Sequence, residues 1–261
     1  MRSPMSQTMI GKLAFITWCL FLFYNPGTAM GEVTSIPAEF TEIRAVLPDV
    51  LMDIRYYTPH NFVGTRVDGY KAPKCYLTRQ AAQALAGVQR DLAASGLTLK
   101  IYDCYRPQKA VNHFVRWAAA IEDTQTKAEF YPKVDKKNLF KDGYIAEKSG
   151  HSRGSTIDLT IVTIPAAPQE KYVPHKNLRA CYLPHEKRFR DNGIDMGSGF
   201  DCFDEKSHTL NKTIGSSPRL HRALLKNIME KHGFVSYDKE WWHYTLKGEP
   251  FPDTYFDFDI E

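Results

Sequence analysis

A glycine between two candidate metal ligands constrains what this chain can fold into. The stretch from Ser149 to Asp158 places Gly154 between His151 and Asp158, which are seven residues apart. Seven is an odd spacing, so on one uninterrupted strand the two side chains would point to opposite faces of a sheet. Gly154 tolerates the backbone angles of a sharp bend. The sequence therefore predicts that His151 lies on an entering loop and that the β-branched stretch 155–162 is a strand carrying Asp158.

A second cluster of candidate site residues lies about eighty positions further on, at Glu240 and His243. Trp241, Trp242 and Tyr244 stand beside them. The bulk of these aromatic side chains favours a strand or a turn under an apolar roof. Such a roof would limit the access of water to the site.

The two clusters together supply what a catalytic zinc site requires: three protein ligands, an open position for water and a nearby base. His151, Asp158 and His243 are the expected ligands, and Glu240 is the free carboxylate. Taken singly, a histidine near a strand is more often a hydrogen-bonded core or surface residue, and each carboxylate fits an ordinary turn or surface position. The joint occurrence predicts one zinc ion per chain and a zinc hydrolase.

The expected chemistry follows from the same inventory. Zinc lowers the pKa of its bound water from about 15.7 towards roughly 7. Glu240 would take the proton and return it to the leaving amine. Arg106, which follows a predicted strand, would add a second cation beside the oxyanion of the intermediate. An arginine before a proline is also a common surface salt-bridge partner, an alternative that stays open at this stage.

Size, composition and charge exclude several other classes of function. The chain has 261 residues, of which 43% are hydrophobic and 25% charged, as expected for one soluble globular domain. The formal net charge is +4, and the basic residues are scattered rather than clustered, so no nucleic-acid partner is indicated. A metal-independent hydrolase is not indicated either, because no Gly-x-Ser-x-Gly or Ser-x-x-Lys motif stands beside a plausible base.

The N-terminus resembles a targeting segment. Arg2 and Lys12 precede the apolar run 13–24, and Gly27-Thr28-Ala29 offers a small-x-small cleavage site. An apolar run of about a dozen residues is short for a membrane span, although an uncleaved anchor is the alternative. We therefore expect a signal peptide at 1–29, a single mature domain at 30–261, and a periplasmic protein without a membrane partner.

Export changes the interpretation of the cysteines. Four remain after removal of the signal peptide, and an even number in an oxidising compartment predicts two disulfides. Three pairings are open. We favour Cys75 with Cys104, which would tie a loop to the strand end near Arg106, and Cys181 with Cys202. A second zinc site is the rival interpretation, but no Cys-x-x-Cys spacing supports it.

Capping residues and apolar periodicity predict three helices: one from the cap Thr78 to about Ala94, one at 109–120, and one between Ser217 and Gly233. A strand is expected at 97–103. These elements do not alternate as regular βαβ units, which favours an α+β fold with a mostly antiparallel sheet flanked by helices. In the third helix we expect four apolar side chains to face inward: Leu220, Leu224, Leu225 and Ile228.

The motifs resemble a known family, the zinc D-alanyl-D-alanine dipeptidases of the vancomycin-resistance type, which share the fold of the hedgehog signalling domain. The resemblance runs from about residue 40 to the end of the chain. It rests on these stretches: 53–56, 61–64, 68–70, 102–107, 149–160, 195–197, 200–201, 204–208, 240–244 and 255–258.

Carried over position by position, the resemblance implies that His151, Asp158 and His243 bind zinc. Glu240 would then act as general base and acid, and Arg106 would stabilise the oxyanion.

The resemblance also implies contacts at the two ends of a dipeptide substrate. The free amino group would be held by Asp201, helped by Tyr56, and the carboxylate would lie near Ser149 and Tyr70. One departure from the family is the segment 163–192, which looks longer than in the short cytoplasmic members.

Three functions remain open on the sequence alone. The first is hydrolysis of the dipeptide D-alanyl-D-alanine in the periplasm, and the second is a zinc D,D-carboxypeptidase acting on longer peptidoglycan stem peptides. The third is a non-catalytic, zinc-bearing binding domain. Glu240 beside His243 argues against the third, because a structural zinc has no use for an unligated base. Asp201 favours the first over the second, because a longer substrate has an uncharged amide where a dipeptide has an ammonium group.

Overall fold

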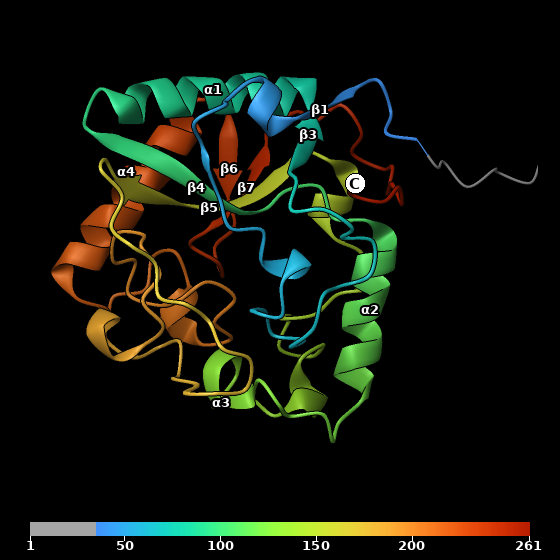
Figure 1. Ribbon diagram of the computed structural model, residues 1–261, viewed down its shortest axis with the longest axis vertical. Helices are drawn as coiled ribbons and strands as arrows, with labels where there is room; N and C mark the ends of the chain where they lie inside the picture. Colours follow the sequence, from blue (N-terminus) through green and yellow to red (C-terminus); the bar gives the residue numbers. More distant parts are fainter. Residues whose placement is uncertain (1–34) are drawn as a thin grey trace, which may run out of the picture. The chain divides into compact units, whose positions relative to one another are not determined.

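A mixed five-stranded sheet forms the centre of the structure (Figure 1), a computed structural model that describes residues 35–261. Its strand order is β2-β4-β5-β7-β6. The bounds of these strands are Leu51–Met52 for β2, Leu97–Asp103 for β4, Thr156–Thr163 for β5, Phe234–Ser236 for β6 and His243–Leu246 for β7. The pair β2 and β4 is parallel and the other pairs are antiparallel. The expected α+β fold with a mostly antiparallel sheet is therefore confirmed, with one parallel pair at its edge.

Within residues 35–261, the remaining elements are a small sheet, four helices and six short 3-10 turns. The small sheet pairs β1 (Phe40–Glu42) with β3 (Tyr76–Thr78) in antiparallel fashion. The helices are α1 (Arg79–Ala93), α2 (Gln108–Ala119), α3 (Lys127–Phe130) and α4 (Ser216–Lys231). The 3-10 turns are η1 (Ile43–Ala45), η2 (Arg55–Tyr57), η3 (Lys136–Asn138), η4 (Gly150–Arg153), η5 (His185–Lys187) and η6 (Glu205–Ser207).

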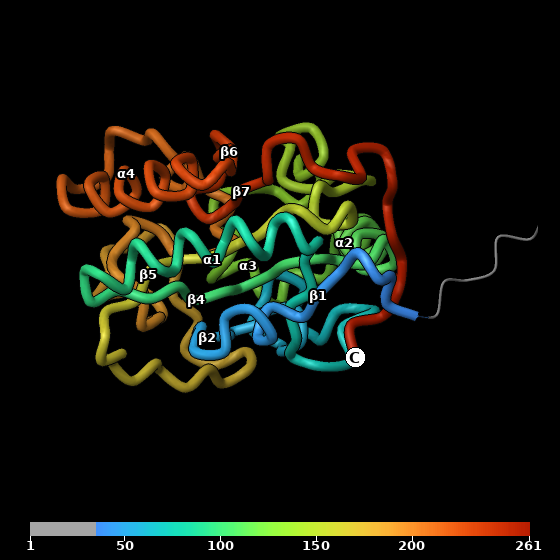
Figure 2. The backbone as a smooth tube through the Cα atoms, turned by 90° about the horizontal axis from the view of Figure 1, so that it is seen from above, coloured from blue at the N-terminus to red at the C-terminus, as the bar shows by residue number. Residues whose placement is uncertain are grey.

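Two helices lie on one side of the central sheet. Helix α1 begins as the sequence indicates, with the side chain of Thr78 accepting a hydrogen bond from the backbone N–H of Ala81. It packs on β4, and α4 packs on β6 and against α1. Figure 2 shows α1 and α4 side by side, whereas α3 lies across the sheet from α1 in Figure 1. No helix in residues 35–261 is long and apolar enough to cross a membrane.

The inward face of α4 differs from the expectation. Leu225 is buried and Ile228 is partly buried, but Leu220 and Leu224 are 70% and 41% exposed. Arg222 takes a buried position on this helix instead, because its guanidinium donates hydrogen bonds to three backbone carbonyls: those of Met196, Lys206 and His208. Satisfying those carbonyls turns the leucine face towards solvent.

The predicted bend at Gly154 is confirmed. Its φ angle is +83°, in the left-handed region, and it ends the turn η4 just before β5 begins. A β-carbon at this position would collide with the ring of Phe40, so the close approach also requires glycine. Beyond the bend, β5 is buried from Thr156 to Val162, in accordance with its β-branched sequence.

Two disulfides and a buried ionic network fix the less regular parts of the chain. The favoured pairings are both confirmed: Cys75 with Cys104 and Cys181 with Cys202. Between β5 and η6 the only assigned element is the short turn η5. The buried ammonium of Lys100 binds Asp191 at 2.8 Å, and Arg55 binds the same carboxylate at 2.7 Å. These contacts attach the long loop to the sheet.

Candidate active site

Neighbouring strands place an aspartate and a histidine side by side. Asp158 of β5 is paired in register with His243 of β7. The turn η4 brings His151 next to both of them, and the side chains of His151 and Asp158 are buried. The structure thus brings together the three residues predicted as metal ligands, from two strands and the turn that the glycine bend makes.

The donor atoms of these three residues lie at the separations of a tetrahedral metal site, with each histidine facing a different oxygen of Asp158. His151 Nε2 lies 3.3 Å from His243 Nδ1 and 3.3 Å from Asp158 Oδ2. His243 Nδ1 lies 3.2 Å from Asp158 Oδ1. Ligand bonds of about 2.1 Å at tetrahedral angles would separate the donor atoms by about 3.4 Å. Among residues 35–261 this is the group of histidine, cysteine and acidic side chains that could hold a metal ion.

Two further contacts support metal binding. The Nδ1 atom of His151 lies 2.7 Å from the carbonyl oxygen of Cys104, so donation to that carbonyl leaves Nε2 free as a ligand. Asp158 Oδ1 is buried and accepts no hydrogen bond, a deficit that a metal ion would remove. Burial opposes ionisation of Asp158, but the interactions with His151 and His243 outweigh it and hold the pKa of this carboxyl well below its usual range.

Glu240 lies beside the ligands without belonging to them. It occupies the turn just before β7, and its Oε2 atom is 3.4 Å from His243 Nδ1. Its side chain is 28% exposed and lines the same cavity as the ligands. Burial raises the pKa of Glu240 above its usual value, although the charge of His243 offsets part of the rise. A carboxylate with these properties is suited to take up and release a proton.

Arg106 is held by an acidic residue for which the sequence indicated no role. Asp103, at the end of β4, is fully buried and lies opposite Asp158 in the strand register. Its Oδ2 accepts a hydrogen bond from Nε of Arg106 at 2.9 Å and forms an ion pair with Nη2 at 2.9 Å, and its Oδ1 accepts a hydrogen bond from the hydroxyl of Tyr70 at 2.6 Å. Arg106 Nη2 also lies 3.5 Å from Asp158. Arg106 is therefore a positioned cation within the site and not a surface residue.

Asp201 and Tyr56 form the second polar centre of the site. Both are buried, and the hydroxyl of Tyr56 donates a hydrogen bond to Asp201 Oδ2 at 2.9 Å. Burial raises the pKa of Asp201 well above its usual value, and the neighbouring charge of Asp158 raises it further. A carboxyl group in these surroundings is stabilised in its ionised form by a cation placed against it.

The metal ligands and Asp201 line one cavity of about 210 Å³. This volume is below the range of about 300–1,000 Å³ that is typical of sites for drug-sized ligands, so it suits a small substrate. Ser149 and Lys148 lie in its wall, and the Ser149 hydroxyl accepts a hydrogen bond from Arg106 at 3.4 Å. Tyr70 does not line the cavity: its hydroxyl binds Asp103 behind Arg106, so it supports the site from outside.

The apolar wall is not built from the residues that the sequence suggested. Trp241 and Trp242 are buried but do not line the cavity. Trp242 lies in the turn just before β7, and its ring packs against Phe200, which does not line the cavity. The aromatic residues that do line the cavity are Tyr56, Phe62, Phe114, Tyr144, Phe203 and Tyr237.

This geometry agrees with a comparison against protein families. The model of the D-ala-D-ala dipeptidase family, peptidase family M15, matches residues 37–165 and 185–261. The chain belongs to this family. It is therefore a metallopeptidase, and the His151, Asp158 and His243 cluster is its candidate metal centre.

Individual members of the dipeptidase family are similar over most of their length. A D-alanyl-D-alanine dipeptidase of Enterococcus faecalis is 41% identical over 223 residues, which cover 85% of this chain and 98% of the relative. The enzyme of the same name from Enterococcus faecium is 37% identical over 224 residues, with the same coverage. That of Streptomyces coelicolor is 38% identical over 222 residues, again covering 85% and 98%.

The family match stops where the sequence departed from the resemblance. Residues 166–184 remain unmatched, and they lie inside the segment 163–192 that looked longer than in other members. Part of this insertion is attached next to the site, because its Cys181 is bonded to Cys202, the neighbour of Asp201. The site of this family member thus includes a covalent link to a segment that the family model does not match.

Proposed function

We propose that this protein is an exported, zinc-dependent dipeptidase that hydrolyses D-alanyl-D-alanine to two molecules of D-alanine. The names of its relatives support the substrate, and the tetrahedral spacing of two imidazoles and one carboxylate supports zinc. The observation that carries the proposal is the buried Asp201 carboxylate in the same small cavity as the metal ligands. It supplies the counter-charge for a free amino group.

Both ends of a zwitterionic dipeptide find opposite charge in this cavity. The amino group would bind Asp201, whose position is supported by the hydroxyl of Tyr56. The carboxylate end would lie near Ser149 and Lys148, which line the cavity wall. Asp201 can form a charge-assisted hydrogen bond with an ammonium group, whereas facing an acylated nitrogen would leave the buried carboxylate without a cation.

The catalytic roles follow from the contacts of this chain. Zinc, when bound, supplies a Lewis acid that polarises the scissile carbonyl and makes water acidic near neutral pH. Glu240 would take the proton of the attacking water and hand it to the leaving amine. Arg106, held in place by Asp103, would stabilise the negative charge that develops on the carbonyl oxygen. His151 keeps one ring nitrogen directed at the metal position through its contact with Cys104.

The two other functions considered from the sequence fit this site less well. A carboxypeptidase of longer stem peptides would place an uncharged amide against Asp201, which is buried and has only the Tyr56 hydroxyl as a hydrogen-bond donor among its side-chain contacts. A binding domain without catalysis would not need Glu240 in the cavity, 3.4 Å from a metal ligand but outside the ligand set.

The proposed export rests on the sequence of residues 1–29, which lie outside the described part of the chain. The two disulfides are consistent with an oxidising compartment such as the periplasm. In that compartment a dipeptidase would act on dipeptides released from the cell wall, because the cytosolic precursor pool is out of its reach. N-terminal sequencing of the secreted protein should begin at Met30, and an intact Met1 would contradict the cleavage.

A substrate panel tests the proposed activity. The purified protein is assayed on the D,D, L,D and L,L forms of alanyl-alanine, on N-acetyl-D-alanyl-D-alanine and on a D-alanine-terminated tripeptide, with zinc content measured in parallel. We expect one zinc per chain, a strong preference for the free D,D-dipeptide, loss of activity on chelation and recovery when zinc is added back.

Two results would contradict the proposal. Full activity after exhaustive chelation would exclude a zinc enzyme. Equal turnover of the free and the acetylated dipeptide would exclude the role of Asp201 and favour a carboxypeptidase.

A further inference from the structure

The substrate-binding carboxylate has less backbone support than the metal ligands. Asp158 lies on β5 and His243 on β7, in adjacent strands of the sheet. Asp201 lies in the irregular stretch between β5 and η6, where η5 is the only assigned element. Strand pairing therefore fixes the ligands, and other contacts have to fix Asp201.

The backbone of Asp201 is held in an unusual conformation. Its φ angle is +55°, in the left-handed region that non-glycine residues rarely occupy. A residue persists in this region only when the surrounding structure over-determines it. The one side-chain hydrogen bond of Asp201 comes from Tyr56, so the constraint on its backbone has to come from its chain neighbours.

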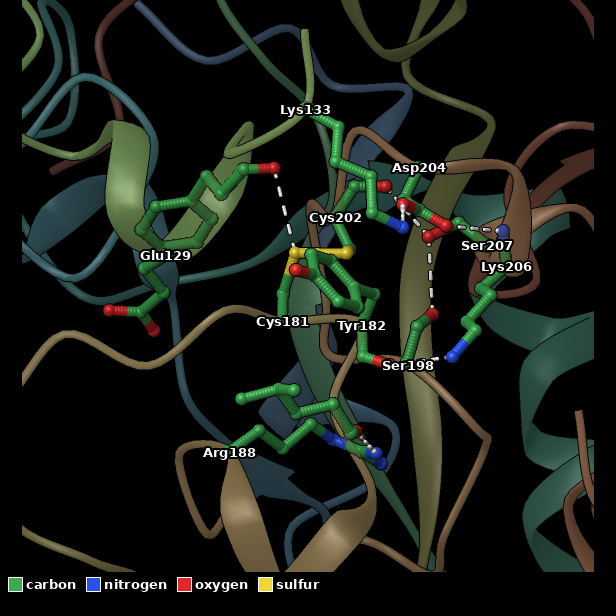
Figure 3. The surroundings of a disulfide bond; sticks show 12 residues. Glu129, Lys133, Cys181, Tyr182, Arg188, Ser198, Cys202, Asp204, Lys206 and Ser207 are labelled. Atoms are coloured by element: carbon green, nitrogen blue, oxygen red, sulfur yellow. Dashed lines mark hydrogen bonds and ion pairs between the residues drawn. A yellow bond between two sulfur atoms is a disulfide. The ribbon is translucent and has the colours of Figure 1, made fainter.

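The next residue, Cys202, supplies such a constraint. It is bonded to Cys181 by the disulfide that Figure 3 shows, and both cysteines are buried. The carbonyl oxygen of Cys202 also accepts a hydrogen bond from the hydroxyl of Ser207 at 2.7 Å. Position 202 is thus held by a covalent bond on one side and a hydrogen bond on the other.

The other half of the disulfide is itself anchored. The backbone N–H of Cys181 donates to the carbonyl of Glu129 in α3 at 2.9 Å, and its own carbonyl accepts from the N–H of Gly199 at 2.8 Å. Phe203, on the far side of Cys202, donates its N–H to the carbonyl of Phe130 at 2.8 Å. These hydrogen bonds attach both flanks of Asp201 to helix α3, Phe203 directly and Gly199 through Cys181. The disulfide adds a covalent link between the two attachments, next to Asp201.

We propose that Cys181 and Cys202 are positioning residues for substrate selection: their disulfide keeps Asp201 in the left-handed conformation that directs its carboxylate into the cavity. This inference rests on the proposed function, because it assumes that Asp201 binds the amino group of the dipeptide. Without the bond, Asp201 can relax to a common backbone conformation, and the carboxylate moves away from the amino group.

The second disulfide offers a matched control, because it lies next to the metal centre instead. Cys104 is bonded to Cys75, and its carbonyl oxygen contacts the metal ligand His151. The two disulfides span 21 and 29 residues, so loss of either one removes a similar constraint on the unfolded chain. If removing the two disulfides changes the substrate preference differently, the difference then reflects their different places in the site.

The experiment compares four zinc-loaded proteins: the unmodified enzyme, C181A/C202A, C75A/C104A and D201A. For each, kcat and KM are measured on D-alanyl-D-alanine and on its N-acetyl derivative, and zinc content and circular dichroism are recorded. In C181A/C202A we expect KM for the free dipeptide to rise about tenfold or more, as for a misaligned charge-assisted hydrogen bond, with a much smaller change in kcat. The preference for the free dipeptide should fall towards that of D201A.

The control should respond differently. C75A/C104A should lower turnover of both substrates in proportion and leave the preference unchanged. A second pair, Cys181→Val with Cys202→Ala, fills more of the volume left by the sulfur atoms and gives the same comparison should the alanine pair fail to fold.

Two outcomes overturn the inference in distinguishable ways. In the first, D201A changes the substrate preference, but a folded variant without the Cys181–Cys202 disulfide keeps the original preference. This result would refute the role of the disulfide and leave the proposed function standing. A D201A variant that keeps the original preference would refute the binding role of Asp201, and the inference would fall with it.

Discussion

Asp103 offers the sharpest test of how Arg106, the residue proposed to stabilise the oxyanion, is positioned. Its Oδ2 accepts a hydrogen bond from Nε of Arg106 and forms an ion pair with Nη2, both at 2.9 Å, in a fully buried environment. The substitution Asp103→Asn keeps the size of the side chain but removes its charge. Arg106 then loses the ion pair and the charge-assisted part of the hydrogen bond, while Asp158, 3.5 Å from its Nη2, remains.

The expected loss can be worked from these contacts. A hydrogen bond to a charged group contributes about 1.5–3 kcal/mol and a neutral one about 0.5–1.5 kcal/mol, so the bond from Nε loses roughly 1–1.5 kcal/mol. With a similar loss assigned to the buried ion pair at Nη2, the total is about 2–3 kcal/mol, or about a 30- to 150-fold lower rate if the full loss is felt in the transition state. In the proposed mechanism Arg106 acts on charge that develops during the reaction, so kcat should fall while KM changes little.

The assay measures kcat and KM on D-alanyl-D-alanine together with zinc content and thermal stability. Asp68→Asn is the control: this carboxylate is 48% exposed and pairs with Arg116 and His113 at the surface, so its loss should change kcat less than twofold. A kcat of Asp103→Asn within twofold of the unmodified enzyme, at full zinc content, would refute the reasoning. So would a fall in kcat that follows loss of zinc, because Asp103 would then act through His151, 3.5 Å away.

Three further predictions test other parts of the structure. Glu240→Gln should retain zinc and lose about 10²–10⁴-fold in kcat; zinc loss in step with activity would instead make Glu240 a ligand. Lys148→Met should raise KM for the free dipeptide but not for its C-terminal amide, and equal effects on both would exclude a carboxylate contact. Arg222→Met should cost on the order of 3–5 kcal/mol, since three carbonyls lose a buried donor, and should lower the melting temperature by roughly 6–20 °C; an effect no larger than that of the exposed Arg219→Met would contradict this.

The metal centre was predictable because its signals are local. The odd spacing of His151 and Asp158 required a bend, and Gly154 between them supplies it. Glu240 and His243 are close in sequence, and a turn followed by a strand keeps them adjacent in space. Pairing of β5 with β7 then brings the two clusters together. That pairing is a long-range contact, and the sequence on its own does not specify which strand lies next to β5.

The errors have a common physical cause, which is tertiary contact. Leu220 and Leu224 follow helical periodicity, yet the buried hydrogen bonds of Arg222 rotate the helix away from them. Trp241 and Trp242 are beside the site in sequence, but they lie in the turn before β7 and pack into the core instead of lining the cavity. Apolar periodicity gives the spacing of a buried helix face. It does not reveal whether a polar residue with buried hydrogen bonds, such as Arg222, occupies that face in place of the leucines.

Asp103 was missed for a related reason. A single aspartate at a strand end has many ordinary roles, and only the folded structure shows it buried between Arg106 and Tyr70. Its position three residues before the arginine was the available signal, because a carboxylate that close in sequence can reach the guanidinium when the chain turns after the strand.

The two halves of the site are therefore encoded in different ways, and this has a consequence for how the enzyme can change. Asp158 and His243 depend on strand register, so a substitution that shifts one ligand disturbs the core as well. Asp201 depends on long-range contacts: a hydrogen bond from Tyr56, 145 positions away, and the Cys181–Cys202 disulfide, which reaches into the segment that the family model does not match. Such contacts can be lost or gained without disturbing the sheet. If Asp201 binds the substrate as proposed, substitutions in the loop between β5 and η6 of this chain can change substrate preference while the metal centre keeps its geometry.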